Sequence, residues 1–75
     1  MLLLNNDKVI SKLYGEGIGL KLIGTNLEFI KTIKSGETLN TRVPTLLWNR
    51  AQEPSKYPED EQVLLSVLDS IIAEV

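Results

Sequence analysis

Glycines gather ahead of an apolar run, in a pattern that could belong to a phosphate-binding loop. The stretch Tyr14–Gly24 reads YGEGIGLKLIG and holds four of the five glycines of this 75-residue chain. A P-loop requires lysine directly after the second glycine of G-x-x-x-x-G, but Thr25 follows Gly24. A dinucleotide-binding loop requires glycine three residues after Gly17, where the chain has Leu20. We therefore expect these glycines to shape turns and bulges where the chain enters a sheet.

The side chains that could act as nucleophiles or metal ligands lack the partners that such chemistry needs. The chain has neither histidine nor cysteine, which removes the commonest general base, the thiolate nucleophile and the main zinc ligands. Glu59, Asp60 and Glu61 are consecutive, and consecutive helix positions point about 100° apart, so these acids cannot converge on one cation. We interpret them as surface acids that favour a helix start. The sequence predicts a protein that is not an enzyme and holds no cofactor or metal.

Length and charge indicate a single small domain, residues 1–75, that gains stability from association. Small domains usually add disulfides, a metal or a partner subunit, and without cysteine or histidine self-association is the route that remains. Residues 1–42 carry six basic and four acidic side chains, whereas residues 43–75 carry two and six. The start MLLLNND lacks the charged region and long apolar stretch of a signal peptide. No apolar segment approaches the ~20 residues that span a bilayer, so we expect a cytoplasmic protein without membrane contact.

The clearest predicted element is a helix over residues 58–74. Pro58 suits a first helical position, and no helix-breaking residue follows before the terminus. The apolar positions of this helix cover an arc of roughly 200°, about twice what packing on one side requires. We therefore predict that the helix touches its own sheet and a second chain, as a homo-oligomer. The residues expected to mediate self-association are Leu65, Leu68, Ile72 and Val75.

Alternating and β-branched residues predict strands over 18–23, 27–34 and 38–43. Residues 24–26 form a turn, and the dipeptide Ser35-Gly36 joins the second and third strands. The competing interpretation is a short helix over 26–36, with Asn26 as its cap. Residues 7–14, which Asp7 could cap and Gly15 could close, and residues 44–52 fit either a helix or a strand. The expected fold is α+β: residues 1–53 mainly β with room for short helical turns, a connector over 54–58, and an antiparallel sheet of three or four strands packed against one C-terminal helix.

The segment LLWNRAQEPSKYP holds the residue types most enriched at interface hot spots. Trp48, Arg50 and Tyr57 lie in or beside a proline-bounded connector, and we predict that they contact another protein. The alternative for Trp48 is a place in the core, because a domain this small needs its one tryptophan inside.

Basic residues of the predicted sheet suggest a second kind of partner. The side chains that could share its open face and follow a nucleic-acid backbone are Lys21, Lys31, Lys34 and Arg42. A sequence pI near 5.0 and a single sheet aromatic, Phe29, weigh against this. The sequence thus predicts a small protein-protein interaction module, such as an adaptor, an assembly factor or an inhibitor of a larger protein. The alternative is a nucleic-acid-binding regulator.

Overall fold

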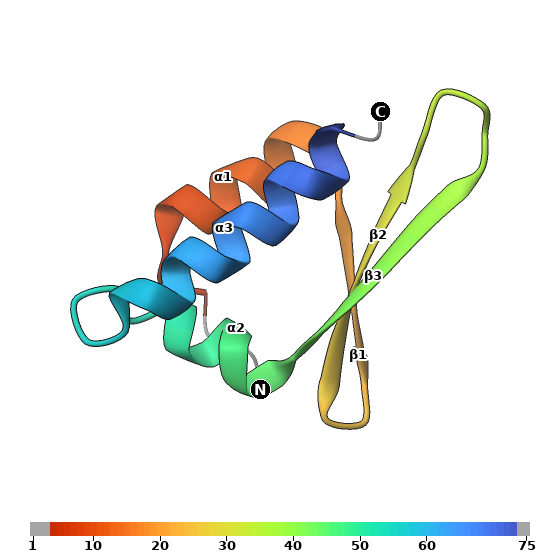
Figure 1. Cartoon of the computed structure of the whole chain (residues 1–75). Helices are drawn as coiled ribbons and strands as arrows, with labels where there is room; N and C mark the ends of the chain where they lie inside the picture. Colours follow the sequence, from red (N-terminus) through yellow and green to blue (C-terminus); the bar gives the residue numbers. More distant parts are fainter. Residues whose placement is uncertain (1–3, 74–75) are drawn as a thin grey trace.

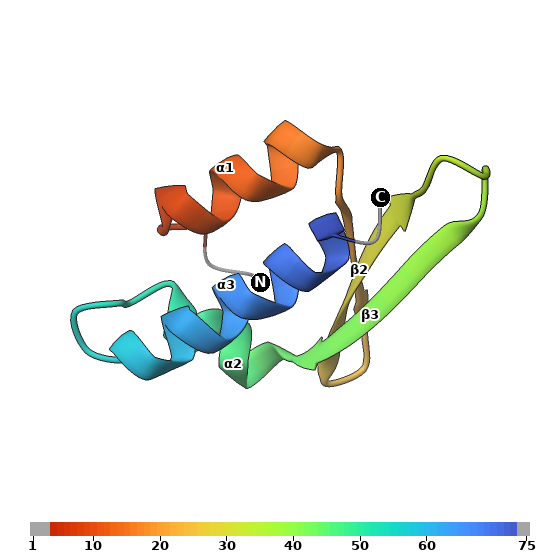
Figure 2. The ribbon, with the colours of Figure 1, turned by 45° about the horizontal axis from the view of Figure 1, so that its top comes forward.

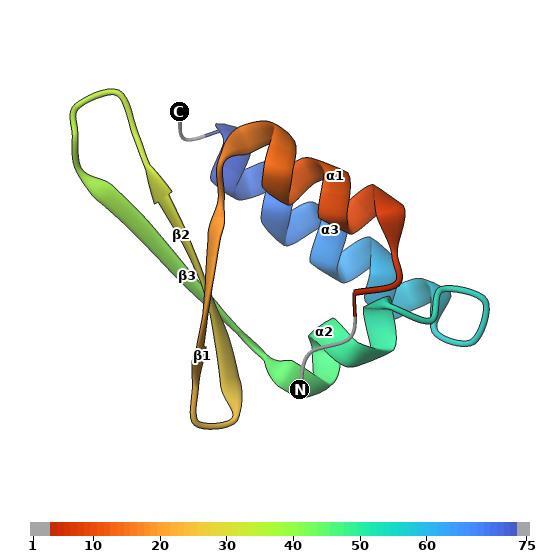
Figure 3. The same ribbon diagram turned by 180° about the vertical axis from the view of Figure 1, so that it is seen from behind.

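Residues 4–73, which the computed structural model describes, form one antiparallel sheet and three helices (Figure 1). The elements follow one another as α1 (Asp7–Glu16), β1 (Gly19–Ile23), β2 (Asn26–Thr32), β3 (Thr38–Pro44), α2 (Thr45–Ala51) and α3 (Pro58–Ala73). The strands lie in the order β1-β2-β3, and the helices stand to one side of the sheet (Figure 3). The predicted small α+β fold with a C-terminal helix is confirmed. The two segments that the sequence left open are mainly helical, as α1 and α2.

Helix α1 begins one residue earlier and ends two residues later than the sequence suggests. The capping side chain is Asn6 and not Asp7, because Asn6 Oδ1 accepts a hydrogen bond from the Lys8 backbone N–H at 3.1 Å. The helix passes Gly15 and ends at Gly17, whose φ of 65° suits glycine. The Ile18 N–H then donates to the Leu13 carbonyl at 2.9 Å, and both side chains are buried. This Schellman-type ending turns the chain from α1 towards the start of β1.

The turn between β1 and β2 fixes the register of the first hairpin. Ile23 pairs with Asn26, so the loop consists of Gly24 and Thr25 alone. Gly24 has a φ of 59° and Thr25 has a negative φ, which corresponds to the type II′ turn that favours glycine at its first central position. The glycines of the opening stretch thus include a helix cap and a hairpin turn.

The connection between β2 and β3 is longer than predicted. Strand β2 ends at Thr32 rather than near residue 34, and Thr32 pairs with Thr38. The Gly36 N–H donates to the Ile33 carbonyl at 2.9 Å, and Gly36 takes a φ of 88°. This five-residue connection, residues 33–37, replaces the predicted Ser35-Gly36 turn, and the alternative of a short helix over 26–36 is wrong.

The core lies between the helices and one face of the sheet. Phe29 on β2 and Trp48 on α2 are fully buried, with their ring centroids 6.1 Å apart. Leu64 and Leu68 of α3 and Val9 of α1 complete the centre of this core, each with no exposed surface. Helix α3 contacts both α1 and α2 (Figure 2). The centre of its wide apolar arc is therefore covered within the same chain, whereas Val63 at the border of the arc is 50% exposed.

Candidate functional site

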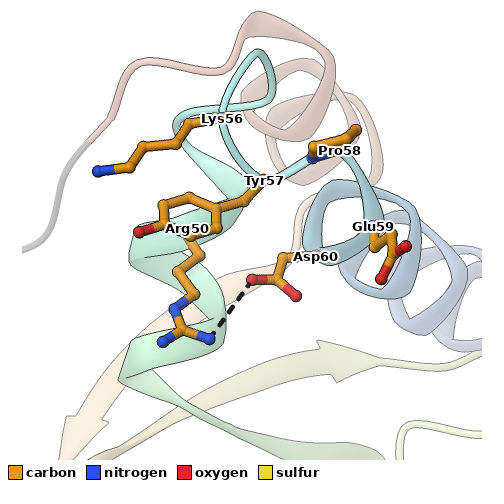
Figure 4. Close-up of a pocket in the computed structure, with 6 residues that line it drawn as sticks. All are labelled: Arg50, Lys56, Tyr57, Pro58, Glu59 and Asp60. Carbon is orange, nitrogen blue, oxygen red and sulfur yellow. Dashed lines mark ion pairs between the residues drawn. The ribbon is translucent and has the colours of Figure 1, made fainter.

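The predicted contact residues separate into one core residue and two surface residues. Trp48 has no exposed surface and packs beside Phe29, so it belongs to the core. Arg50 and Tyr57 lie where the chain leaves α2 and enters α3 (Figure 4). The Tyr57 ring lies between two cations, with Arg50 Cζ 5.2 Å and Lys56 Nζ 5.3 Å from its centroid.

The arrangement around Tyr57 is close to neutral. Arg50 Nη1 lies 4.0 Å from Asp60 Oδ2, and the Glu59 carboxylate lines the same surface pocket of about 350 Å³. Two acids therefore balance the two cations that flank the ring. We interpret this cluster chiefly as a set of contacts that stabilises the connector between α2 and α3.

The four predicted self-association residues do not form an exposed face. Leu68 is fully buried, whereas Leu65 and Ile72 are half-buried and pack against the core. Val75 lies outside the described residues. The large apolar side chain of α3 that is exposed is Val63, at 50%.

The predicted basic face is divided by the register of the sheet. Lys21 and Arg42 both lie opposite Glu28, so these three side chains form one row on the open face. Lys31 shares the other face with Phe29, is 8% exposed and donates from Nζ to the Glu16 carbonyl at 2.6 Å. Lys34 lies in the loop after β2. The open face therefore gathers two of the four predicted cations, with a carboxylate between them.

A buried polar cluster, which the sequence did not reveal, joins the start of α1 to the other two helices. Asn6 Nδ2 donates to the Ala51 carbonyl and to Glu61 Oε2, each at 2.8 Å. Gln52 Oε1 accepts from the Asn6 backbone N–H at 2.9 Å. Glu61 is 7% exposed, so its interpretation as a surface acid is wrong. Its place on the buried face, near Leu64 and Leu68, was the available signal.

A second feature that sequence reasoning missed is an apolar surface at the corner between α1 and β1. We call it the α1–β1 surface; it consists of Leu4, Tyr14, Leu20 and Leu22, which are 56%, 79%, 36% and 54% exposed. The first three line a hollow of about 270 Å³, and Leu22 continues the same face of β1. In residues 4–73, these are four of the six large apolar side chains that are exposed. The sequence shows the alternation of Leu20 and Leu22. It does not show that the helices leave this end of the sheet face uncovered.

The α1–β1 surface borders an open strand edge. Strand β1 pairs with β2 on one side only, as the first strand of the order β1-β2-β3. The opposite edge, on β3, exposes polar side chains at Thr38, Asn40 and Arg42, and ends in Pro44, which has no N–H to donate. Of the two edges in the described sheet, β1 is the one flanked by exposed apolar side chains.

Comparison of the chain with protein-family models, curated proteins and solved structures gives no match. Within residues 4–73, no helix has the length and apolar character needed to cross a membrane. The same residues contain no group of three or more acidic side chains placed to hold a metal ion. The candidate site is therefore defined by its own geometry, and it is the α1–β1 surface with the edge of β1.

Proposed function

We propose that the chain is a non-enzymatic interaction module that binds a partner protein of different sequence through the α1–β1 surface. The observation that carries this proposal is the clustering of exposed apolar side chains there, next to an unpaired strand edge. Exposed apolar side chains scattered singly are ordinary, whereas a group beside a hollow is typical of a binding surface. An adaptor, an assembly factor or an inhibitor of a larger protein would each use such a surface.

The energetics favour the α1–β1 surface over the connector as the main contact. Full burial of a leucine or tyrosine-sized side chain contributes roughly 1.5–3 kcal/mol, and several such side chains are available here. At the connector, Arg50 and Tyr57 already contact each other, and Asp60 lies near Arg50. We assign the connector a peripheral role at most in binding.

The arrangement of α3 also favours a partner of different sequence over self-association. Leu68 is fully buried, and Leu65 and Ile72 are half-buried and pack against the core, so they offer a second copy little exposed apolar surface. We therefore place the partner-binding contact on the α1–β1 surface, and not on α3 as the sequence predicted.

A photo-reactive phenylalanine analogue at position 14 tests the proposal in the cells from which the chain comes. Tyr14 is 79% exposed, so the analogue should be tolerated, and Leu46 on α2, 58% exposed, is the matched control position. We expect a covalent adduct with another protein from position 14 and none from position 46. The adduct should disappear when Leu20→Asp is added. Equal adducts from both positions, or an adduct that contains only a second copy of the chain, would contradict the proposal.

The alternative function, a nucleic-acid-binding regulator, would depend on Lys21, Lys34 and Arg42. We favour it less because Glu28 lies between two of these cations and accepts a hydrogen bond from Arg42. Binding to mixed-sequence oligonucleotides at two salt concentrations tests it, because phosphate-driven affinity falls steeply with salt. We expect no binding even at the lower salt; salt-sensitive binding lost in Arg42→Gln would support the alternative.

A further inference from the structure

We propose that the free edge of β1 receives an extended segment of the partner protein, with an acidic residue of that segment opposite Lys21 and apolar residues opposite Leu20 and Leu22. This inference rests on the proposed function, since it names the kind of segment that the α1–β1 surface binds. Three observations carry it: the direction of the backbone groups of β1, the alternation of its side chains, and the charge of Lys21.

The turn geometry determines which peptide groups of β1 are free. In a two-residue hairpin the closing pair is hydrogen bonded, and hydrogen-bonded pairs then recur at every second residue. Ile23 and Asn26 are the closing pair, so Lys21 forms the next hydrogen-bonded pair with Glu28. The peptide groups of Leu20 and Leu22 consequently point away from β2. They offer two donors and two acceptors at the spacing that an added strand requires.

The side chains of β1 provide apolar contacts for every second residue of such a strand. Leu20 lies opposite Phe29 and Leu22 opposite Leu27, and both partners are fully buried on the helix-facing side of the sheet. An added strand would place its own alternate residues beside Leu20 and Leu22. The hollow that Tyr14 and Leu20 line lies next to them, so apolar side chains of the segment would be covered there.

Lys21 supplies a charge preference on the other side of the same edge. Its cross-strand neighbour is Glu28, but the Glu28 carboxylate accepts a hydrogen bond from Arg42 Nε at 3.1 Å, and the residue as a whole is only 7% exposed. In the described part of the chain, no ion pair within 4.0 Å involves Lys21. Oppositely charged residues in direct cross-strand positions stabilise a strand pair, so an acidic residue opposite Lys21 is favoured.

The same lysine disfavours a second copy of the chain as the occupant. The antiparallel pairing of two β1 strands with full overlap is centred on Lys21 and places the two lysines opposite each other. Like charges in this position destabilise a strand pair, and an edge lysine is a common protection against self-pairing. The geometry therefore selects an acidic segment of a different protein.

Capped nine-residue peptides test the inference with the full chain. In the first peptide valine alternates with threonine and glutamate occupies the central position, whereas the second carries lysine there. A third repeats the first but has N-methyl groups on the peptide nitrogens that would face β1. Binding is measured by the shifts of the Leu20 and Leu22 amide signals in nuclear magnetic resonance spectra and by the titration midpoint.

We expect the glutamate peptide to bind about three- to tenfold more tightly than the lysine peptide. N-methylation should weaken binding by at least about tenfold, because each lost backbone hydrogen bond leaves an acceptor unpaired. The variant Lys21→Gln should remove most of the discrimination, and Lys21→Glu should reverse it. The neutral variant keeps the test valid if a second carboxylate beside Glu28 impairs folding.

Each contrary result overturns a defined part of the inference. Equal binding of the N-methylated peptide would exclude strand pairing, and discrimination that persists in Lys21→Gln would exclude Lys21 as its cause. No binding by any peptide, or concentration-dependent shifts of the chain alone with dimers in sedimentation, would overturn the inference as a whole. A cross-linked partner at position 14 together with failed peptides would leave the proposed function standing and refute only the extended segment.

Discussion

Lys21 lies directly opposite Glu28 in the β1–β2 ladder, yet the Glu28 carboxylate accepts its side-chain hydrogen bond from Arg42 on the far side of β2. Arg42 therefore competes with Lys21 for the only acid in this row of the open face. This competition leaves the charge of Lys21 available at the edge of β1. Arg42 on β3 thereby influences the proposed docking edge on β1, although β1 and β3 are the two opposite edge strands of the sheet.

Replacing Arg42 should weaken the charge preference of the docking edge. In Arg42→Gln the Glu28 carboxylate is free to pair with Lys21, so the discrimination between glutamate and lysine peptides should fall by about twofold or more. Thr38→Ala, on the same strand and exposed, is the control and should leave the discrimination unchanged. Peptide titration measures both variants. If Arg42→Gln still discriminates equally between the glutamate and lysine peptides, Glu28 does not couple Arg42 to Lys21.

The buried cluster around Asn6 should make a large contribution to the free energy of unfolding. Asn6→Ala removes the cap of α1 and two buried hydrogen bonds, so we expect a loss of about 2–4 kcal/mol. Asn6→Asp separates these effects, because aspartate still caps the helix but cannot donate to Glu61 or to the Ala51 carbonyl. Urea denaturation should show a loss above about 1 kcal/mol for Asn6→Asp as well. Stability equal to that of the unchanged chain would mean that the cluster adds nothing beyond the cap.

Two glycines at the end of α1 should respond to alanine in opposite directions. Gly15 is helical and a Cβ added there meets no atom within 4 Å, so Gly15→Ala should stabilise by about 0.5–1 kcal/mol. Gly17 has a φ of 65°, so Gly17→Ala should cost about 1–2 kcal/mol. Thermal and urea unfolding of both variants measure the difference. A neutral Gly17→Ala would argue against the Schellman-type ending of α1.

Leu68 of α3 should act through the core of a single chain. Leu68→Ala should lower the free energy of unfolding by about 2–5 kcal/mol, whereas Val63→Ala, at an exposed position of the same helix, should change it by less than about 0.5 kcal/mol. Sedimentation of the unchanged chain should give the mass of a monomer over the whole range of concentrations used. A dimer whose dissociation follows Leu68→Ala would instead restore the sequence-based prediction of self-association through α3.

Much of the fold follows from local patterns, because periodicity and turn chemistry act over short distances. The acidic first turn and uninterrupted run after Pro58 predict α3, and glycine at position 24 predicts the first hairpin. Helices α1 and α2 were ambiguous because they are only 10 and 7 residues long, and tertiary packing decides such short segments. Leu68 illustrates what periodicity cannot predict. A wide apolar arc indicates that a helix is covered on that side, but not whether its own chain or another chain covers it.

The candidate site was less predictable, because it depends on pairing between distant residues. Lys21 and Lys31 look equivalent in the sequence, yet the register places them on opposite faces of the sheet. A shift of one residue in the pairing would exchange these faces, and nothing local specifies it apart from the turn. The exposure of Leu20 likewise depends on where α1 and α2 end, which a strand pattern does not contain.

Amide hydrogen exchange at β1 tests the central claim most directly. In the free chain, the Leu20 and Leu22 amides should exchange rapidly, whereas the Lys21 amide, paired with β2, should exchange slowly. Saturating glutamate peptide should protect the Leu20 and Leu22 amides by at least about tenfold and leave the exposed edge of β3 unchanged. Protection at β3 instead, or a Leu20 amide that exchanges equally fast with and without bound peptide, would contradict docking at the edge of β1.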